Sequence, residues 1–172
     1  MITAAFVRHM ARYNRWQNRL IYDLADEVGE AARREDCAMC FGTIHNTLSH
    51  QLWDDRMIMT CLAGWPPAEV KTVRTSVGLY DDWADLRLEH AASDERLIAW
   101  ADGLTDDRLG GTVLWRSAAA EQAGEKPVSL VVMQMFNHQT HHRGQLHVML
   151  SQKGAKTVHT DVAYMPEQDE AA

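Results

Sequence analysis

The chain has 172 residues, a length that suits one domain with a sizeable buried core. Its 46% apolar and 24% charged residues are typical of a globular protein, and a net charge of -7 without a basic stripe argues against nucleic acid or an anionic membrane as a partner. Because it has no long apolar run and no signal-peptide pattern, we expect a cytoplasmic protein. We expect one domain over residues 1–166 and a flexible tail over residues 167–172.

The first half of the chain contains two segments with apolar residues at helical spacing. The first predicts a helix over about residues 3–28, and Gly29 is a natural stop for it. The second predicts a helix that begins at Thr43, a residue suited to an N-cap, and ends before Gly64. The polar segment between them, residues 30–40, is expected to be a connection.

The second half contains two further helical patterns, over about residues 79–101 and residues 127–152. Residues 104–126 between them are the least helical part, and residues 113–115 fit either a short strand or an extended loop. Four long amphipathic helices without alternating strands predict an all-α protein, and a four-helix bundle is the architecture they favour.

The three cysteines do not form the pattern of a disulfide framework, because their number is odd and no secretory signal precedes them. Cys37 and Cys40 form a lone C-x-x-C, which could be a redox pair or half of a zinc site. Since neither a second C-x-x-C nor a thioredoxin-like βαβ pattern accompanies it, we interpret it as two thiols in a connection between helices.

Three histidines lie within five residues of the fourth predicted helix, from His138 to His142. A step of about 100° per residue places these two within about 40° of each other, so that both imidazoles can face one point. His141 lies about 60° to one side and remains a competing partner of His138, whereas His147 lies on the opposite face and is expected to be solvated or structural. Two histidines four residues apart form half of a tetrahedral metal site.

A third ligand must come from another helix, and His50 in the second predicted helix is the candidate. His45 points about 140° away from it, so we expect only one of the two to reach the histidine pair. Asp54, one turn after His50, could orient an imidazole or remain a surface acid, and we favour the surface position. Gln145 shares the face of His138 and could hydrogen-bond a ligand or a bound water.

Two aromatic residues of the first predicted helix, Tyr13 and Trp16, are candidates for the wall of a substrate pocket above the metal. Aromatic residues at such positions also suit a packed core, so both interpretations stay open. Together with Gln145, they form the expected substrate pocket.

Three segments of the chain form motifs. Residues 13–18 read Tyr-Asn-Arg-Trp-Gln-Asn, and residues 47–55 read Thr-Leu-Ser-His-Gln-Leu-Trp-Asp-Asp. Residues 136–145 read Phe-Asn-His-Gln-Thr-His-His-Arg-Gly-Gln, and this third motif is the specific one. In all three the chain resembles the DinB family of bacterial metalloproteins, over about residues 4–154. The resemblance implies a four-helix bundle of the DinB/YfiT-like type.

The resemblance also implies a histidine triad, with His50 on the second helix and both His138 and His142 on the fourth. The chain departs from the family pattern at Ser49, where asparagine is usual, and at Gln51, where an aliphatic residue is usual. Neither change removes a ligand. Three neutral imidazoles with an open position are the arrangement of a catalytic zinc site, and imidazole suits zinc or nickel. The family's bundles often pair, so a homodimer is expected.

A divalent ion at such a site would lower the pKa of a bound water or bind a thiol as thiolate. Because some relatives in the wider superfamily are thiol-dependent, the resemblance favours S-transfer from a low-molecular-weight thiol to a small-molecule substrate, in stress response or detoxification. Metal-dependent hydrolysis is the alternative among enzymes, although no glutamate accompanies the histidines as a general base. A stress protein that binds a metal or ligand without turnover is the alternative from another class.

Overall fold

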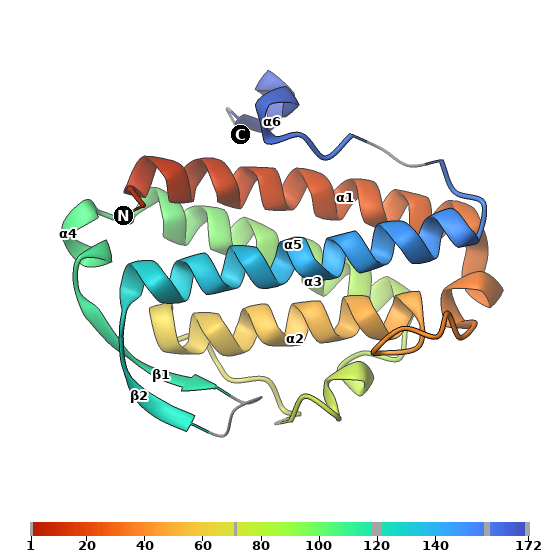
Figure 1. Ribbon diagram of the computed structural model, residues 1–172, viewed down its shortest axis with the longest axis horizontal. Helices are drawn as coiled ribbons and strands as arrows, with labels where there is room; N and C mark the ends of the chain where they lie inside the picture. The colour runs from red at the N-terminus through yellow and green to blue at the C-terminus, as the bar shows by residue number, and fades with distance from the viewer. Residues whose placement is uncertain (1, 71, 118–121, 157–158, 171–172) are drawn as a thin grey trace.

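The computed structural model describes residues 2–70, 72–117, 122–156 and 159–170, and the fold is mainly helical, as predicted (Figure 1). None of the described helices is both long enough and apolar enough to cross a membrane. The long helices are α1 (Ala4–Arg34), α2 (Ile44–Ala63), α3 (Trp83–Asp102) and α5 (Val128–Gln152). The short elements are η1 (Ser76–Gly78), α4 (Asp106–Leu109), β1 (Thr112–Ser117), β2 (Gln122–Pro127), η2 (Val162–Tyr164) and α6 (Glu167–Glu170).

The ends of the first two long helices follow from local sequence signals. Thr43 is the N-cap of α2, as predicted, and its side chain accepts a hydrogen bond from the amide of Asn46 at 3.0 Å. Gly64 closes α2 in the left-handed conformation that glycine adopts without strain, with a φ of 67°. Gly29 interrupts α1 with a φ of 80°, but one further turn continues to Arg34, beyond the predicted end.

The remaining long helices differ from the predictions only at their ends. The N-cap of α3 is Asp82, which accepts a hydrogen bond from the amide of Asp85 at 2.9 Å, so residues 79–81 belong to the connection. The segment predicted to be least helical contains α4 and an antiparallel hairpin of β1 and β2. Trp115 pairs with Gly124 in this hairpin, which confirms the strand alternative for residues 113–115.

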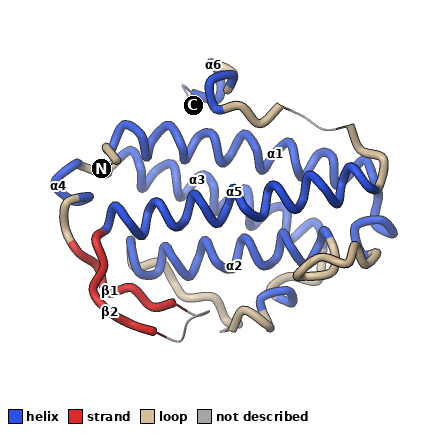
Figure 2. The backbone as a smooth tube through the Cα atoms, viewed as in Figure 1, coloured by secondary structure: helices blue, strands red, loops and turns tan. Residues whose placement is uncertain are grey.

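The four long helices lie side by side (Figure 1). Helix α1 packs against α3 and α5, and α2 packs against α5 and α3. Helices α1 and α5 run in one direction and α2 and α3 in the other, because the connection after α2 crosses back along the molecule before α3 begins (Figure 2). The direct contact between α2 and α5 brings together the two helices that carry the candidate ligands.

Two apolar clusters fill the interior, one toward each end of the long helices. The first includes Val7 and Met135, and the second includes Leu48 and Leu146. Each long helix contributes buried polar side chains midway along its length, between the two clusters. Because burying polar groups is costly unless they find partners, this polar layer needs a specific arrangement of contacts. Its members are Asn14, Asn18, His50, Gln51, Asp55, His90, Asp94, Gln139, His142 and Arg143.

The C-terminal end of the described chain packs on α1, where α6 lies (Figure 1). Asp169 is only 4% exposed, and its carboxylate accepts a hydrogen bond from the Arg19 guanidinium at 2.8 Å. We expected a flexible tail over residues 167–172. Residues 167–170 form a helical turn in which Asp169 pairs with Arg19 of α1, and residues 171–172 lie outside the described part.

Candidate metal centre

Three histidines converge at the level of the polar layer, between α2 and α5. His138 and His142 stand one turn apart on α5, and their Nε2 atoms are 3.0 Å apart. His50 faces them from α2, with its ring centroid 5.3 Å from that of His138 and 4.9 Å from that of His142. One ring nitrogen from each residue lies within 4.8 Å of the other two. The structure thus brings together the three residues predicted as ligands.

The tautomer of His50 follows from its neighbour on η1. Its Nδ1 lies 2.7 Å from the hydroxyl of Ser76, and that hydroxyl donates its single hydrogen to the carbonyl of Val73 at 2.6 Å. Ser76 can therefore only accept from His50, so the proton of the neutral imidazole sits on Nδ1. The lone pair on Nε2 is left for the space shared with the other two histidines.

Gln145 orients His142 in the same way. Its Oε1 lies 2.8 Å from Nδ1 of His142, and its Nε2 lies 3.1 Å from Nε2 of His141. An amide oxygen only accepts, so Nδ1 of His142 carries the proton and its Nε2 carries a lone pair. This position agrees with the prediction that Gln145 could hydrogen-bond a ligand, because it contacts the candidate ligand His142 directly.

Asp54 lies against His138, so the surface position that we favoured for it is wrong. Its Oδ2 lies 3.1 Å from Nδ1 of His138, and its side chain is only 22% exposed. The angle of this contact is not that of a hydrogen bond, since Nδ1 has no hydrogen-bond partner. A carboxylate next to the outer nitrogen of a ligand histidine nonetheless favours the proton on that nitrogen, and such pairs fix the ring in many metal sites. The sequence position one turn after His50 could not reveal this contact, because it is made with another helix.

The environment keeps the three imidazoles neutral. Burial, followed by the neighbouring imidazoles, lowers the pKa of His50 and of His138 to about 3. Burial also lowers the pKa of His142, although the hydrogen bond with Gln145 acts in the opposite direction. Burial raises the pKa of Asp54 to about 7. At neutral pH the histidines are therefore in the unprotonated form that binds metal ions.

This donor set fits a divalent metal ion. One ring nitrogen from each of the three residues lies within 4.8 Å of the other two, and the Nε2 atoms of His138 and His142 are 3.0 Å apart. Neighbouring nitrogen ligands of a tetrahedral zinc lie about 3.3 Å apart, given Zn–N distances of roughly 2.0–2.1 Å. A divalent cation among these nitrogens would replace the hydrogen bond between His138 and His142 with bonds to all three rings. Within the part of the chain that the structure describes, no fourth His, Cys, Asp or Glu joins the cluster, which leaves a coordination position open.

A cavity of about 300 Å³ opens onto the triad. Phe41 forms part of its wall and stacks on His50 with a centroid distance of 3.9 Å and an angle of 23° between the planes. Gln145 also lines it, as expected. Further lining residues are Cys40, Asp54, Met57, Val73, Trp115, Arg116, Gln134 and His141.

Tyr13 and Trp16 do not line this cavity, which corrects the expectation that they lie above the metal. Both are buried against each other and against Met165, and the Tyr13 hydroxyl donates a hydrogen bond to the carbonyl of Thr160 at 2.6 Å. The face of α1 that carries them is covered by the C-terminal segment. That long-range contact has no local sequence signal, so the alternative of a packed position was the correct one.

The other histidines and the cysteine that the sequence offered as alternative site residues lie at the margin of the site or away from it. His141 is exposed at the edge of the cavity, and His45 is held on α2 by a 2.8 Å hydrogen bond to the carbonyl of Tyr80. His147 lines a different cavity with Tyr13. Cys40, expected to be an ordinary residue of a connection, is exposed at the triad cavity as a free thiol.

Sequence reasoning missed several residues that shape the centre: Ser76, Phe41 and the hairpin residue Trp115. All three lie outside the long helices, so helical periodicity carries no information about them. Trp115 stands in the segment already marked as irregular, and only its flanking glycines suggested a turn nearby. Their contacts with the triad depend on how the connections fold back over α2 and α5.

A model of the DinB family matches residues 1–171. The chain belongs to the DinB family. This membership confirms the resemblance drawn from the three motifs, and it covers essentially the whole chain, including the segment that packs on α1. No curated protein and no solved structure matches the chain. Within this DinB protein, the histidine triad combines convergent neutral donors with an adjoining cavity.

Proposed function

We propose that this DinB-family protein is a metal-dependent enzyme that activates a thiol or a water at His50, His138 and His142. One observation carries the proposal: the outer nitrogens of the three rings face Ser76, Asp54 and Gln145, which leaves every Nε2 directed at one point. A site of three histidines with an open position is typical of catalysis, whereas structural zinc sites are closed by four protein ligands. Zinc and nickel both suit three imidazoles.

The chain's own residues define what such a site can do. The cavity next to the triad admits a small molecule, and Arg116 adds a positive charge to its wall. A divalent ion held by the triad would supply a thiolate or a hydroxide at neutral pH. Asp54 and Ser76 would keep the imidazole rings in place, and Phe41 would shield His50 from water.

Transfer of a low-molecular-weight thiol is the reaction that we favour. In it, the thiolate sulfur attacks an electrophilic carbon of the cosubstrate, a C–S bond forms, and the leaving group departs with its electron pair while the thiol proton passes to solvent. Support comes from family membership and from the absence of a glutamate among the described residues lining the cavity, since zinc hydrolases commonly use one as a general base. Metal-dependent hydrolysis is the second candidate, favoured by Asp54, a carboxyl group that lines the same cavity.

We also propose a location, an oligomeric state and a biological role for the enzyme. We place it in the cytoplasm as a homodimer with a role in stress response or detoxification, and we regard its four long helices as a bundle of the DinB/YfiT-like type. A metal- or ligand-binding stress protein without turnover is the alternative if the experiments below find metal but no reaction.

Elemental analysis of untagged protein, purified without chelator, tests the metal centre. We expect about one equivalent of zinc or nickel per chain, and its loss in the His50→Ala variant. Protein that contains no metal and takes none up on titration would contradict the proposal.

Cobalt substitution separates the candidate reactions. In a thiol transferase, a cognate thiol should change the visible spectrum of the cobalt-loaded protein, because sulfur would enter the open position. In a hydrolase, activity should rise with pH through the pKa of the metal-bound water. A metal-binding protein without turnover should show neither behaviour, while the metal would still raise its thermal stability.

A further inference from the structure

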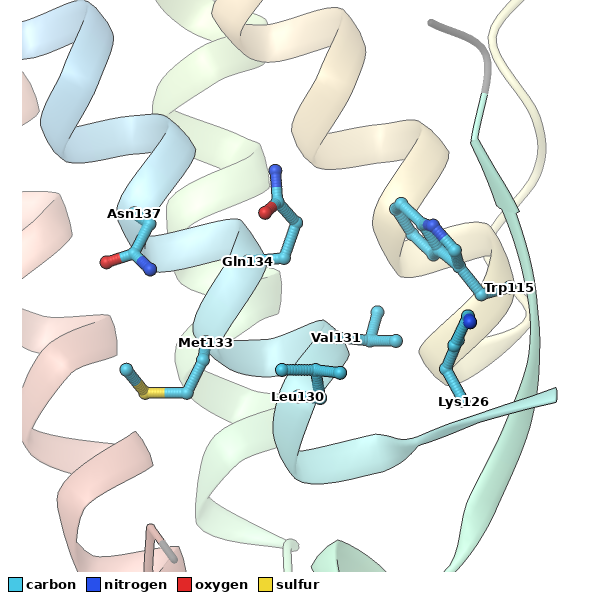
Figure 3. Close-up of a pocket in the computed structure, with 7 residues that line it drawn as sticks. All are labelled: Trp115, Lys126, Leu130, Val131, Met133, Gln134 and Asn137. Atoms are coloured by element: carbon cyan, nitrogen blue, oxygen red, sulfur yellow. The ribbon is translucent and has the colours of Figure 1, made fainter. Parts of the chain in front are cut away.

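A groove of about 390 Å³ lies between the first turns of α5 and the β1–β2 hairpin (Figure 3). Leu130 and Val131 reach from α5 toward the hairpin, where Trp115 and Lys126 face them. Val131 is buried, but Leu130 is 51% exposed, so the groove offers apolar surface that the described chain leaves uncovered. Its other lining residues are Met133, Gln134 and Asn137.

The groove adjoins the histidine cavity. Trp115 and Gln134 line both spaces, one from the hairpin and one from α5. Leu130, Gln134 and His138 follow one another at intervals of four residues, so they form a single stripe along α5. The groove therefore leads along this stripe to a residue of the triad, and the two spaces together have the size of a small-molecule site.

The hairpin register explains why Trp115 and Lys126 face the same space. Lys126 is directly opposite Val113, and Trp115 lies two residues beyond Val113 on the same strand, so all three share one face of the hairpin. Gly124 is opposite Trp115, and a Cβ atom added there would meet nothing within 4 Å. The absence of a side chain at Gly124 keeps the space beside the indole open.

The charges around the two spaces have one prevailing sign. Lys126 lines the groove and Arg116 lines the histidine cavity, although the chain as a whole has a net charge of -7. Among the described residues that line the two spaces, the only carboxylate belongs to Asp54, which lies against His138. Two cations and an apolar wall in an acidic protein favour an anionic ligand with an apolar body.

We infer that the groove binds the apolar body of an anionic small-molecule substrate, with its carboxylate at Lys126 and its reacting end at the histidine triad. The inference rests on the proposed function for the reacting end, and it adds the class of substrate. Eight residues of α-helix separate Leu130 from His138, a rise of about 12 Å, which an extended chain of roughly eight to ten carbons spans.

Binding of straight-chain carboxylates tests the groove, because these probes contain neither a thiol nor an electrophilic carbon. Titration calorimetry on the protein as purified should show affinity rising by up to about fourfold per methylene from hexanoate to decanoate. Octanol should bind at least about tenfold more weakly than octanoate, since it cannot pair with Lys126. The Leu130→Ala variant should lose part of the gain with chain length.

A matched pair of charge reversals locates the carboxylate. Lys126→Glu should weaken octanoate binding by about tenfold or more, whereas Lys156→Glu, the same change on an exposed residue beyond the far end of α5, should alter it by less than about twofold. Equal losses in the two variants would show a general charge effect and overturn the inference, as would equal affinity for octanoate and octanol.

Metal analysis of the same samples keeps the two proposals apart. Octanoate binding that depends on Lys126, in a protein that contains no metal and takes none up on titration, would support the groove and contradict the metal-dependent function. Octanoate binding that survives Lys126→Glu but is lost when the metal is removed would place the carboxylate on the triad. That result would overturn the groove and leave the metal centre intact.

Discussion

The hydroxyl of Ser76 lies 2.7 Å from Nδ1 of His50 and donates its own hydrogen to Val73. Ser76 thus fixes both the tautomer and the rotation of an imidazole that belongs to another element. The relationship makes a residue of the connection between α2 and α3 part of the metal centre. It also predicts that metal affinity depends on a side chain that does not contact the metal.

Replacement of Ser76 by alanine should weaken metal binding by about tenfold to a hundredfold while all three histidines remain. Competition with a chromophoric chelator measures the affinity. The control is Ser151→Ala, the same change on an exposed residue in the last turn of α5, which should bind metal like the parent. If both variants match the parent, the hydroxyl has no role in holding His50.

The ligand assignment predicts opposite results for two histidines of α5. His142→Ala should lose the metal, because it removes one of three Nε2 donors. His147→Ala should keep it, because His147 lines a different cavity with Tyr13 and Thr160. Elemental analysis of both variants checks the prediction, and equal metal content in the two variants would refute the assignment.

The helical parts of the site were predictable from local patterns. Spacing of four residues on α5 puts His138 and His142 on one face, and Thr43 and Gly64 set the ends of α2 through their own backbone and side-chain preferences. Each of these signals acts within a few residues. That is why the pair on α5 and the extent of α2 could be derived before any packing was known.

The rest of the site depends on contacts between distant segments. Ser76 and Asp54 reach their histidines only after the connections fold and α2 packs on α5. We expected Tyr13 and Trp16 at the pocket because no pattern in the sequence indicates that the C-terminal segment covers them. Its docking depends on the buried carboxylate of Asp169, which pairs with residues about 150 positions earlier.

The polar layer predicts a pH dependence of stability through His90. Its Nε2 lies 3.2 Å from the amide nitrogen of Asn18, which can only donate, and its Nδ1 lies 3.0 Å from the hydroxyl of Tyr22. Both contacts suit a neutral ring. Burial, and then the charges of Arg56 and Arg143, lower the pKa of His90 to about 3.

Because the pKa of His90 is lower in the folded state than in the unfolded state, acid favours unfolding. As the pH falls below about 6.5, the unfolded chain binds a proton at this residue while the folded chain does not, until about pH 3. His90→Phe should therefore reduce the slope of the unfolding free energy against pH by about 1.4 kcal/mol per unit between pH 4 and 6.

Urea unfolding of the parent and of His90→Phe at several pH values provides the measurement. Only the slopes are compared, so a constant loss of stability from the missing hydrogen bonds does not affect the result. Burial raises the pKa of Asp94 to about 7 and gives a slope of the opposite sign, but this group is present in both proteins. Parallel curves for the two proteins would show that His90 takes up its proton equally in both states.

Two leucines of α3, only two positions apart, differ in their surroundings. Leu86 is fully buried in the cluster with Leu48 and Leu146, whereas Leu88 is 67% exposed. Leu86→Ala should lower the unfolding free energy by about 2–5 kcal/mol, because it removes buried apolar contact and leaves a cavity. Leu88→Ala makes the same chemical change on the same helix and should alter it by less than about 0.5 kcal/mol. Chemical denaturation measures the unfolding free energy of both variants. If Leu88→Ala lowered it as much as Leu86→Ala, the exposed face of α3 would be covered in solution. A homodimer that formed through this face would cover it.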